Sequence, residues 1–366
     1  MVQDSDRNAK EGSPVNSKIT IHDVAERCGV SISTVHQALY GKKGVSDQTR
    51  DRIRQVAEEM GYSPNPMASS LKRKTKHVAL IFPNSNYYGT VWSGARDYLS
   101  GVRNGGLEWT EMPLGEGGLN ETSSQLVQRL RAQGIDGILM TGHSDIFTED
   151  DWADIRESGI AVSLLGADMP QSGRIFCVLP DYEIIGRTMA ELVLSRVPFY
   201  GSIAICAGNP KWEPHARVVL GFEEYLRECN AQNHIYMDHS WNKEEDSYRG
   251  IVKMLERSDV AACCSVLSQS SLLLGRALRE SGKAGKIFAV GSDLSPENID
   301  CLKTGVFNNL IQKNPYAQGY LGARNLGEYL MFGKKPETDK LLVGSEVVFR
   351  SNVSMYENWN YRQLLH

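Results

Sequence analysis

Short apolar runs alternate with amphipathic helical stretches from His77 onward, and this alternation limits the possible folds more than any other feature of the chain. Six of these runs are HVALIF, GILMT, IAVSLL, SIAICAG, VAACCSV and KIFAVGSD. Strands that alternate with helices form βαβ units, whose parallel sheets are covered by helices on both faces. Because the region is too long for one α/β lobe, we expect two lobes.

The residues before this region predict three short helices. Thr20 opens a capping box in TIHDVAERC, Gly29 allows a tight turn, and Ser31 is placed to cap the next helix. Ser46 and Gly61 are placed to begin and end a third helix. Two short helices joined by a tight turn and braced by a third form a helix-turn-helix, whose second helix enters the major groove of DNA.

The helix that follows Ser31 carries, on one side, chemistry that suits base edges and phosphates. Gln37 can form a bidentate pair with adenine, and Ile32 can contact a thymine methyl group. Neighbouring groups can bind phosphates, which fixes the register without reading sequence. The alternative is an ordinary three-helix bundle with a solvated helix face.

The segment SPNPMASSLKRKTK, residues 63–76, joins this head to the first apolar run. Asn65 and Pro66 begin a helical turn that is too short to be stable alone in water. Leu71 stands directly before Lys72 and further cations, and an apolar wedge beside positive charge suits a minor-groove intercalating element. The alternative is a basic linker with one incidental leucine. The candidate DNA contacts are Thr20, Ile32, Ser33, Thr34, His36, Gln37, Tyr40, Lys42, Lys43, Leu71 and Lys72.

Charge is distributed unevenly along the chain. Residues 18–76 contain 11 Lys/Arg and 6 Asp/Glu, a net charge of +5, which leaves −9 for the rest of a chain whose total is −4. A basic head on an acidic body indicates a polyanionic partner for the head.

Other sequence features narrow the class of protein. The seven scattered cysteines lack a C-x-x-C pair, so we expect free buried thiols rather than disulfides or a zinc site. Residues 1–17 lack the apolar core of a signal peptide and are expected to be a disordered tail, and no apolar run approaches the ~18 residues of a membrane span. Motifs for hydrolases, phosphate-binding loops and metalloproteases are missing. We therefore expect a cytoplasmic protein that is not an enzyme, with no catalytic residues, metal or cofactor.

The stretch from Ile19 to about Pro83 closely resembles the N-terminal segment of the lactose/galactose repressor family, the LacI-type transcriptional regulators. The resemblance implies a helix-turn-helix DNA-binding domain over 18–63 and a hinge helix with its linker over 64–76. In the family this hinge folds on operator DNA, and Leu71 takes the place of its intercalating leucine. Gln37 and Tyr40 depart from the family, which commonly has an arginine or similar residue and an asparagine there.

The region from His77 onward resembles the type I periplasmic sugar-binding-protein fold, particularly its ribose-binding branch through AVGSDLSPENIDCLKTGVFNNLIQKNPYAQGYLGARNLGEYL. The resemblance implies an effector-binding and dimerisation domain over 77–360. Its first lobe would hold about 77–179 and 312–336, and its second lobe about 180–311 and 337–360.

The same resemblance supplies candidate effector contacts. Tyr87 and Tyr88, with Ser85, come from NSNYYG, and the tyrosines would stack on the apolar face of a sugar. Asp293 and Gln312 would bind sugar hydroxyls at the carboxyl ends of strands. The alternatives are surface aromatic residues for the two tyrosines and, for Asp293, a strand-end residue that caps the next helix.

Several positions depart from the family's charged effector contacts. Arg217 stands one place before the usual arginine, Gln269 begins the pair that replaces Asn-Asp, and Asp168 lies two places beyond the usual acidic residue. Trp212 and His215 in NPKWEPHAR are candidates to compensate, the alternative being a tryptophan that packs on its own lobe. These changes point to a different or modified carbohydrate, or to an effector that is not a sugar.

Together, these observations predict an all-α helix-turn-helix head followed by an α/β, two-lobed, periplasmic-binding-protein-like (type I) domain. We expect an allosteric transcriptional repressor whose affinity for double-stranded operator DNA is controlled by a small-molecule effector of the carbohydrate class. A homodimer is expected because one short helix reads few bases and two half-sites supply the rest. The alternatives are a carbohydrate-binding module without a DNA role and a DNA-binding regulator with a vestigial cleft.

Overall fold

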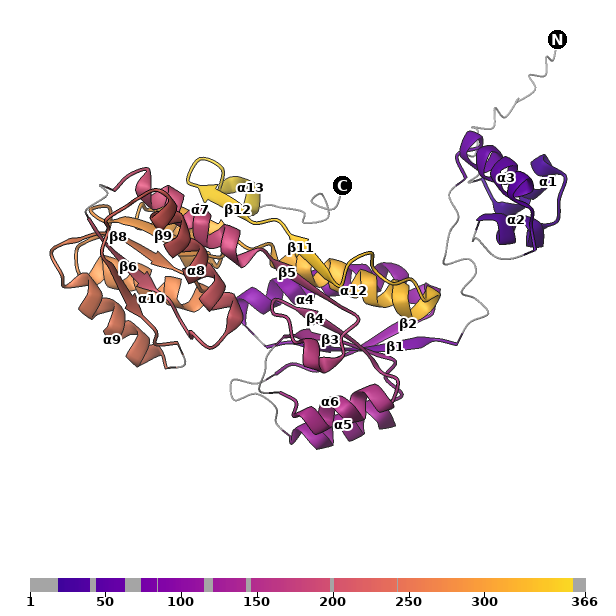
Figure 1. Cartoon of the computed structure of the whole chain (residues 1–366), viewed down its shortest axis with the longest axis horizontal. Helices are drawn as coiled ribbons and strands as arrows, with labels where there is room; N and C mark the ends of the chain where they lie inside the picture. The colour runs from indigo at the N-terminus through magenta and orange to yellow at the C-terminus, as the bar shows by residue number, and fades with distance from the viewer. Residues whose placement is uncertain are drawn as a thin grey trace, which may run out of the picture. The chain divides into compact units, whose positions relative to one another are not determined.

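The computed structural model divides into two compact units, a head within Met1–Lys72 and a body within Arg73–His366 (Figure 1). It describes residues 19–39, 44–62, 74–83, 85–114, 121–142, 146–197, 201–241 and 243–357, without the side chains of Asn86 and Asn104. No helix in these ranges is both long enough and apolar enough to cross a membrane.

Three helices form the head: α1 (Ile21–Cys28), α2 (Ile32–Leu39) and α3 (Asp47–Glu59). The hydroxyl of Ser31 accepts a hydrogen bond from the Thr34 N–H at 3.1 Å, so α2 begins where its N-cap was predicted. Gly29 has a φ of 64°, a left-handed conformation that turns the chain sharply between α1 and α2. The helices share one buried core of Val24, Ala25, Cys28, Val35, Ala38, Ile53 and Ala57.

The first lobe of the body is built on a six-stranded parallel sheet with the order β11-β5-β4-β3-β1-β2. Its strands are β1 (Lys76–Ile81), β2 (Leu107–Glu111), β3 (Gly137–Thr141), β4 (Ala161–Leu165), β5 (Phe176–Pro180) and β11 (Lys340–Val343). Its helices are α4 (Asn86–Val102), α5 (Ser123–Ala132), α6 (Glu149–Glu157) and α12 (Pro315–Phe332), with the short 3-10 turns η2 (Arg103–Gly105) and η3 (Pro170–Ser172).

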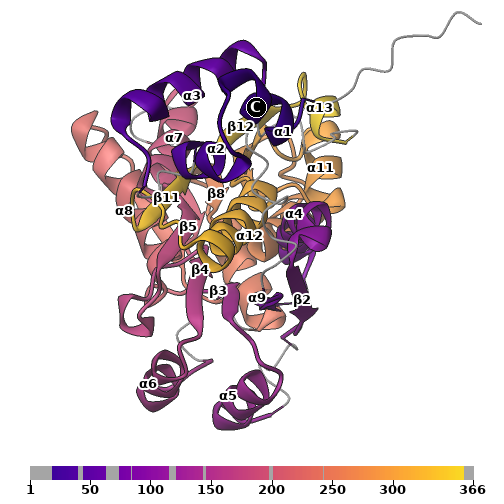
Figure 2. The same cartoon turned by 90° about the vertical axis from the view of Figure 1, so that its right-hand side faces the viewer.

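Side chains along each strand of this sheet alternate between two cores. On β1, Val78 and Leu80 belong to the core shared with α4 and α12, whereas Ala79 and Ile81 belong to the core shared with α5 and α6. Successive strand residues point to opposite faces, so a continuous apolar run indicates a sheet buried on both sides. Figures 1 and 2 show α5 and α6 side by side on one face of the sheet.

The second lobe is built on a second six-stranded sheet with the order β12-β10-β9-β8-β6-β7, in which only the β10–β12 pair is antiparallel. Its strands are β6 (Ser202–Cys206), β7 (Ile235–Asp238), β8 (Val260–Ser265), β9 (Phe288–Ser292), β10 (Asn309–Gln312) and β12 (Glu346–Phe349). Its helices are α7 (Tyr182–Leu194), α8 (Glu213–Glu228), α9 (Glu244–Leu255), α10 (Ser268–Glu280), α11 (Pro296–Lys303) and α13 (Ser354–Glu357).

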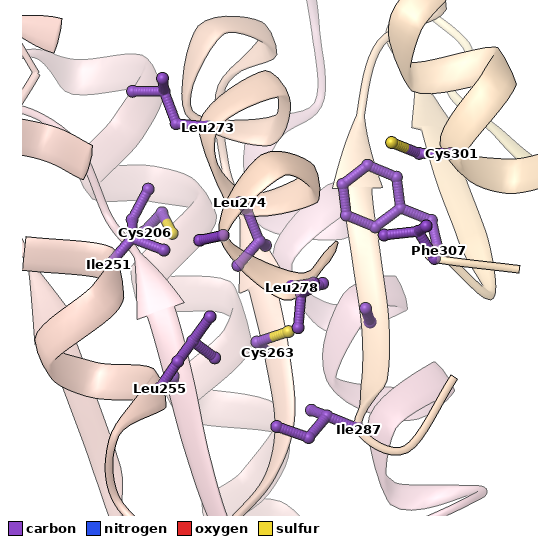
Figure 3. Close-up of a cluster of buried hydrophobic side chains, with 14 of the residues drawn as sticks. Cys206, Ile251, Leu255, Cys263, Leu273, Leu274, Leu278, Ile287, Cys301 and Phe307 are labelled. Carbon is purple, nitrogen blue, oxygen red and sulfur yellow. The ribbon is translucent and has the colours of Figure 1, made fainter. Parts of the chain in front are cut away.

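Helices cover both faces of the second sheet as well. α7 and α8 share one core with it, and α9, α10 and α11 share the other. Figure 3 shows this second core, where Leu274 and Leu278 of α10 lie near Cys206 and Cys263 of the sheet. All seven cysteines are free, and six of them are buried. The exception to the expected burial is Cys229, which is exposed at the end of α8.

Three crossings join the two lobes within the described residues. The chain enters the second lobe after Pro180 and returns to the first after Gln312, and it crosses again between β11 and β12. The placement of 337–360 in the second lobe is therefore wrong for 340–343, because these residues pair with β5 in the first sheet. On the edge strand β11, Val343 is buried and Leu342 is 57% exposed. Four residues are too few for their hydrophobic pattern to indicate which strand β11 pairs with.

Candidate functional site

The outer face of α2 presents the side chains predicted to contact DNA. Ile32, 40% exposed, and Ser33 stand on the solvent side, whereas Val35 and Ala38 are fully buried against α1 and α3. Thr34, His36 and Gln37 are partly exposed. Tyr40, Lys42, Lys43, Leu71 and Lys72 lie outside the described residues, as do residues 1–18 and most of the segment 64–76.

A cation that the sequence analysis did not single out supports the end of α2. The Arg50 guanidinium on α3 donates hydrogen bonds to the carbonyl oxygens of Gln37 and Ala38, both at 3.3 Å. Carbonyls in the last turn of a helix lack partners within the helix, and a cation there is stabilising. Thr20 has a local role at the start of α1, where its N–H and hydroxyl both donate to Asp23 Oδ2 at 2.7 Å. These hydrogen bonds hold the pKa of Asp23 below its usual value.

A cavity of about 180 Å³ lies between the two lobes of the body. Its lining brings together three of the predicted effector contacts, Tyr87, Asp293 and Gln312. The other lining residues are Thr90, Ser268, Leu294, Ser295, Pro296 and Pro315. The wall therefore combines an aromatic ring from α4 with polar groups at the carboxyl ends of β9 and β10.

Two tyrosines at the start of α4 form the aromatic part of this site. Tyr87 and Tyr88 pack edge to face with ring centroids 5.2 Å apart. The Tyr88 hydroxyl shares a hydrogen bond with Thr141 at 2.8 Å, and its ring stacks on Phe82, so Tyr88 supports the wall without lining the cavity. Burial and the nearby Asp293 charge raise the pKa of Tyr87 well above its usual value, so its hydroxyl stays protonated. Ser85 is an exposed N-cap of α4.

Asp293, Lys313 and Gln312 form the polar part of the cavity region. Asp293 is 4% exposed, and its Oδ2 accepts a hydrogen bond from Lys313 Nζ at 3.1 Å. Burial raises the pKa of Asp293, and the Lys313 charge opposes that rise. Asp293 Oδ1 and Gln312 Oε1 are buried and have no hydrogen-bond partner among the described residues.

The remaining predicted effector contacts lie away from this cavity lining. Asp168 forms a buried ion pair with Arg174 and a second contact with Lys340 at 2.9 Å. Arg217 pairs with Glu183 and Glu213 on the surface of α7 and α8, and Gln269 is exposed on α10.

Trp212 and His215 pack on each other within the second lobe. Their rings meet edge to face with centroids 4.4 Å apart, and His215 Nδ1 accepts the Asn209 N–H at 3.0 Å. Burial, with the Lys313 charge, lowers the pKa of His215 to about 3. This imidazole is therefore neutral at physiological pH.

Sequence reasoning missed Thr90, Ser268, Ser295 and Lys313 at this site. A signal existed for two of them. Thr90 lies one helical turn after Tyr87, and Lys313 is a charged residue directly after the buried strand β10. The described residues contain no group of three or more His, Cys, Asp or Glu side chains arranged to hold a metal ion.

Comparisons with known proteins agree with the two-part architecture. A family model described as "Bacterial regulatory proteins, lacI family" matches residues 20–65, and one described as "Periplasmic binding protein domain" matches residues 79–335. The chain therefore carries, over residues 20–65, the N-terminal segment of the lacI family of bacterial regulatory proteins. Its body is a periplasmic-binding-protein domain, so the predicted family and fold class are confirmed. The family is one of transcriptional regulators, which confirms that this lacI-family chain is not an enzyme.

Individual regulators are similar to this chain over more than half of its length. The chain is 43% identical over 218 residues to the HTH-type transcriptional regulator DegA of Bacillus subtilis, an alignment that covers 58% of this chain and 62% of DegA. It is 28% identical to catabolite control protein A of Priestia megaterium, over 57% of this chain and 61% of that protein. These two alignments span less than two thirds of each relative. The ribose operon repressor of Haemophilus influenzae is 26% identical, over 67% of this chain and 73% of the repressor.

Solved structures share the fold of the body. A solute-binding protein from Burkholderia graminis, solved with D-arabinose, superposes with a TM-score of 0.69 at 20% identity, covering 77% of this chain and 98% of that one. A putative LacI regulator from Bacteroides fragilis gives a TM-score of 0.67 at 18% identity, with 77% and 100% covered. At these identities the comparison shows the two-lobed fold alone.

Proposed function

We propose that this lacI-family chain is a sequence-specific DNA-binding transcriptional repressor that acts in the cytoplasm as a homodimer. The observation that carries the proposal is the outer face of α2, where Ile32, Ser33 and Gln37 stand opposite the fully buried Val35 and Ala38. An exposed row of polar and apolar side chains on one helix face can enter the major groove, and two half-sites supply enough base pairs for specificity.

We also propose that a small carbohydrate bound in the cavity between the lobes controls operator affinity. Tyr87 offers a ring for stacking, and Asp293 and Gln312 offer buried acceptors for hydroxyl groups. The names of a ribose operon repressor and of a D-arabinose complex among the similar proteins agree with this ligand class. The effector shifts the population of two lobe arrangements, and the paired hinge segments of the dimer gain or lose their DNA-bound form.

DNA binding is tested with the full-length protein and duplexes selected from a random pool, in the presence of random competitor at moderate ionic strength. We expect a clear preference for one selected sequence. Gln37→Ala should lose discrimination at one base pair by ~1–3 kcal/mol, whereas Gln55→Ala, an exposed glutamine on α3, should leave it unchanged. Binding without preference for any duplex overturns the DNA-binding proposal, and an equal loss on all sequences makes Gln37 a phosphate contact.

The hinge proposal rests on Leu71, which lies outside the described residues. Leu71→Ala should weaken operator binding while sedimentation still shows a dimer, because a minor-groove wedge contacts DNA only. Operator affinity equal to that of the unsubstituted protein would contradict this role.

A further inference from the structure

Lys313 connects the carboxyl ends of three neighbouring strands, β8, β9 and β10, beside the cavity between the lobes. It follows β10 directly, and its side chain is only 8% exposed. Its ammonium donates to Asp293 Oδ2, just after β9, at 3.1 Å and to the carbonyl of Val266, just after β8, at 2.9 Å. An ammonium group has three N–H donors, so two of the three are already used within the protein.

Two acceptor oxygens of residues that line the cavity next to this ion pair are left unpaired by the part of the protein that the structure describes. Asp293 Oδ1 and Gln312 Oε1 have no partner in the described structure, and both residues are at least nine-tenths buried and line the cavity. A buried acceptor without a partner is destabilising, so a ligand that donates hydrogen bonds to both oxygens is favoured. Thr90, Ser268 and Ser295 add hydroxyl groups to the same lining.

The balance of charge at this lining is unfavourable for charged ligands. The carboxylate of Asp293 is neutralised by Lys313 from within the protein, and no arginine is among the lining residues. A ligand phosphate or carboxylate would meet hydroxyl groups of Thr90, Ser268 and Ser295 but no cationic side chain of the lining, and the nearby ammonium of Lys313 is already paired. A ligand ammonium would compete with Lys313 for a carboxylate whose charge is already compensated. A hydroxyl group meets neither penalty, because it can both donate and accept.

We propose that Lys313 determines the class of effector: by neutralising Asp293 internally, it restricts the cavity to an uncharged polyhydroxylated ring, an unmodified monosaccharide. This inference rests on the proposed effector function and narrows it. The cavity volume of about 180 Å³ is similar to the ~150 Å³ of a cavity that holds one benzene ring, so it is large enough for one small ring.

The test is calorimetry of the full-length protein against matched sets of ligands. Each set contains a neutral monosaccharide, its phosphate ester, its uronic acid and its amino derivative. We expect at least one neutral sugar to bind and its three charged derivatives to bind at least tenfold more weakly. A phosphate ester, acid or amine that binds as tightly as its neutral parent overturns the proposal.

Substitution of the lysine tests its role directly. In Lys313→Met, the amine of an amino sugar can take the place of the missing ammonium beside Asp293, so the preference for the amino sugar over its neutral parent should rise at least tenfold. Lys283→Met is the matched control, because the Lys283 ammonium also donates to main-chain carbonyls of the second lobe, those of Leu255 and Arg257, and does not line the cavity. An unchanged preference in Lys313→Met, or the same gain in Lys283→Met, contradicts the role of Lys313.

Two further measurements distinguish a failure of this inference from a failure of the effector proposal or the DNA-binding proposal. The double variant K313M/D293N has no charge at the cavity and should show no gain for the amino sugar. If Lys313→Met does not fold, the binding of neutral and charged ligands to the unsubstituted protein still tests whether the cavity is restricted to uncharged ligands. Operator binding measured in parallel distinguishes the failures: heat from no sugar of any class overturns this inference and the effector proposal together, and leaves the DNA-binding proposal standing.

Discussion

The side-chain amide of Gln318 donates one hydrogen bond to the hydroxyl of Tyr87, at 2.9 Å, and another to the main-chain carbonyl of Lys313, at 2.8 Å. Gln318 lies on α12 and is 1% exposed, so water does not replace either partner. Tyr87 lines the cavity between the lobes, and Lys313 lies where the chain returns from the second lobe to the first. One amide group therefore connects the aromatic wall of the cavity to a crossing between the lobes.

The first prediction concerns this amide. Gln318→Met keeps the volume but leaves the buried Lys313 carbonyl without its donor, so the free energy of unfolding should fall by ~1–3 kcal/mol. Sugar binding measured by calorimetry should weaken about tenfold, because Tyr87 and the crossing lose their shared support. Asn325→Leu on the same helix removes a hydrogen bond to Leu321 within α12 and should leave sugar binding unchanged. Unchanged binding in Gln318→Met would limit Gln318 to a structural role.

The second prediction concerns the crossing of α4 and α12, where two glycines allow the backbones to touch. A Cβ atom at Gly94 would lie 2.1 Å from the carbonyl oxygen of Tyr316, and one at Gly319 would lie 2.0 Å from that of Val91. Gly94→Ala should therefore lower the free energy of unfolding by ~1–3 kcal/mol or more. Gly101→Ala, on the same helix with open space around it, should raise stability by ~0.5–1 kcal/mol. Equal denaturant midpoints for the two variants would contradict the close approach.

Local signals in the sequence were sufficient for much of this fold. The predicted run GILMT is β3, residue for residue, because a strand buried on both faces must be apolar throughout. The capping roles of Ser31 and Ser46 also follow from neighbouring residues alone, and both serines accept the expected main-chain N–H groups. Such features depend on contacts within a few positions along the chain.

Contacts between distant segments account for what the sequence did not reveal. The edge strand β11 has only four residues, and its partner β5 lies far away in the sequence. Asp168 was expected to face the effector, but Arg174 and Lys340 engage it within the first lobe. Lys313 gains its importance only when folding brings Asp293 and Val266 beside it. Nothing in the spacing of these residues indicates that they meet.

The third prediction follows from the buried Asp168–Arg174 pair, whose side chains are 3% and 7% exposed. Burial alone would raise the pKa of Asp168, but the hydrogen bonds from Arg174 and Lys340 outweigh it and lower that pKa. Asp168→Asn should cost ~3–5 kcal/mol in unfolding free energy, because it leaves the Arg174 charge without its buried partner. Sugar binding should be unaffected, because Asp168 does not line the cavity.

A matched surface variant checks that the cost comes from burial. Asp154 pairs with Arg131 at 3.6 Å in the same lobe, with both side chains more than 40% exposed. Asp154→Asn should cost less than ~1 kcal/mol. A loss of sugar affinity in Asp168→Asn, at a temperature where the variant is fully folded, would instead indicate that Asp168 contributes to effector binding.

The fourth prediction is a pH dependence that originates at His215. Its pKa of about 3 in the folded protein lies below the ~6.5 of an unfolded chain, because burial and the Lys313 charge both disfavour the imidazolium. Between these two values the unfolded chain binds a proton that the folded protein does not. Stability should therefore be fully present above about pH 6.5 and fall as the pH drops towards 3, with His215 contributing up to ~1.4 kcal/mol per pH unit.

Urea unfolding of the wild type and His215→Asn at pH 7, 6, 5 and 4.5 isolates this contribution. Asparagine cannot titrate in this range, and its side-chain oxygen can still accept the Asn209 N–H that His215 Nδ1 accepts at 3.0 Å. The variant should be less stable than the wild type at pH 7, since the packing of His215 on Trp212 is lost. The difference should narrow with each step towards pH 4.5, because only the wild type pays for keeping the imidazole neutral. Parallel stability curves for the two proteins would show that His215 is not held neutral in the folded state.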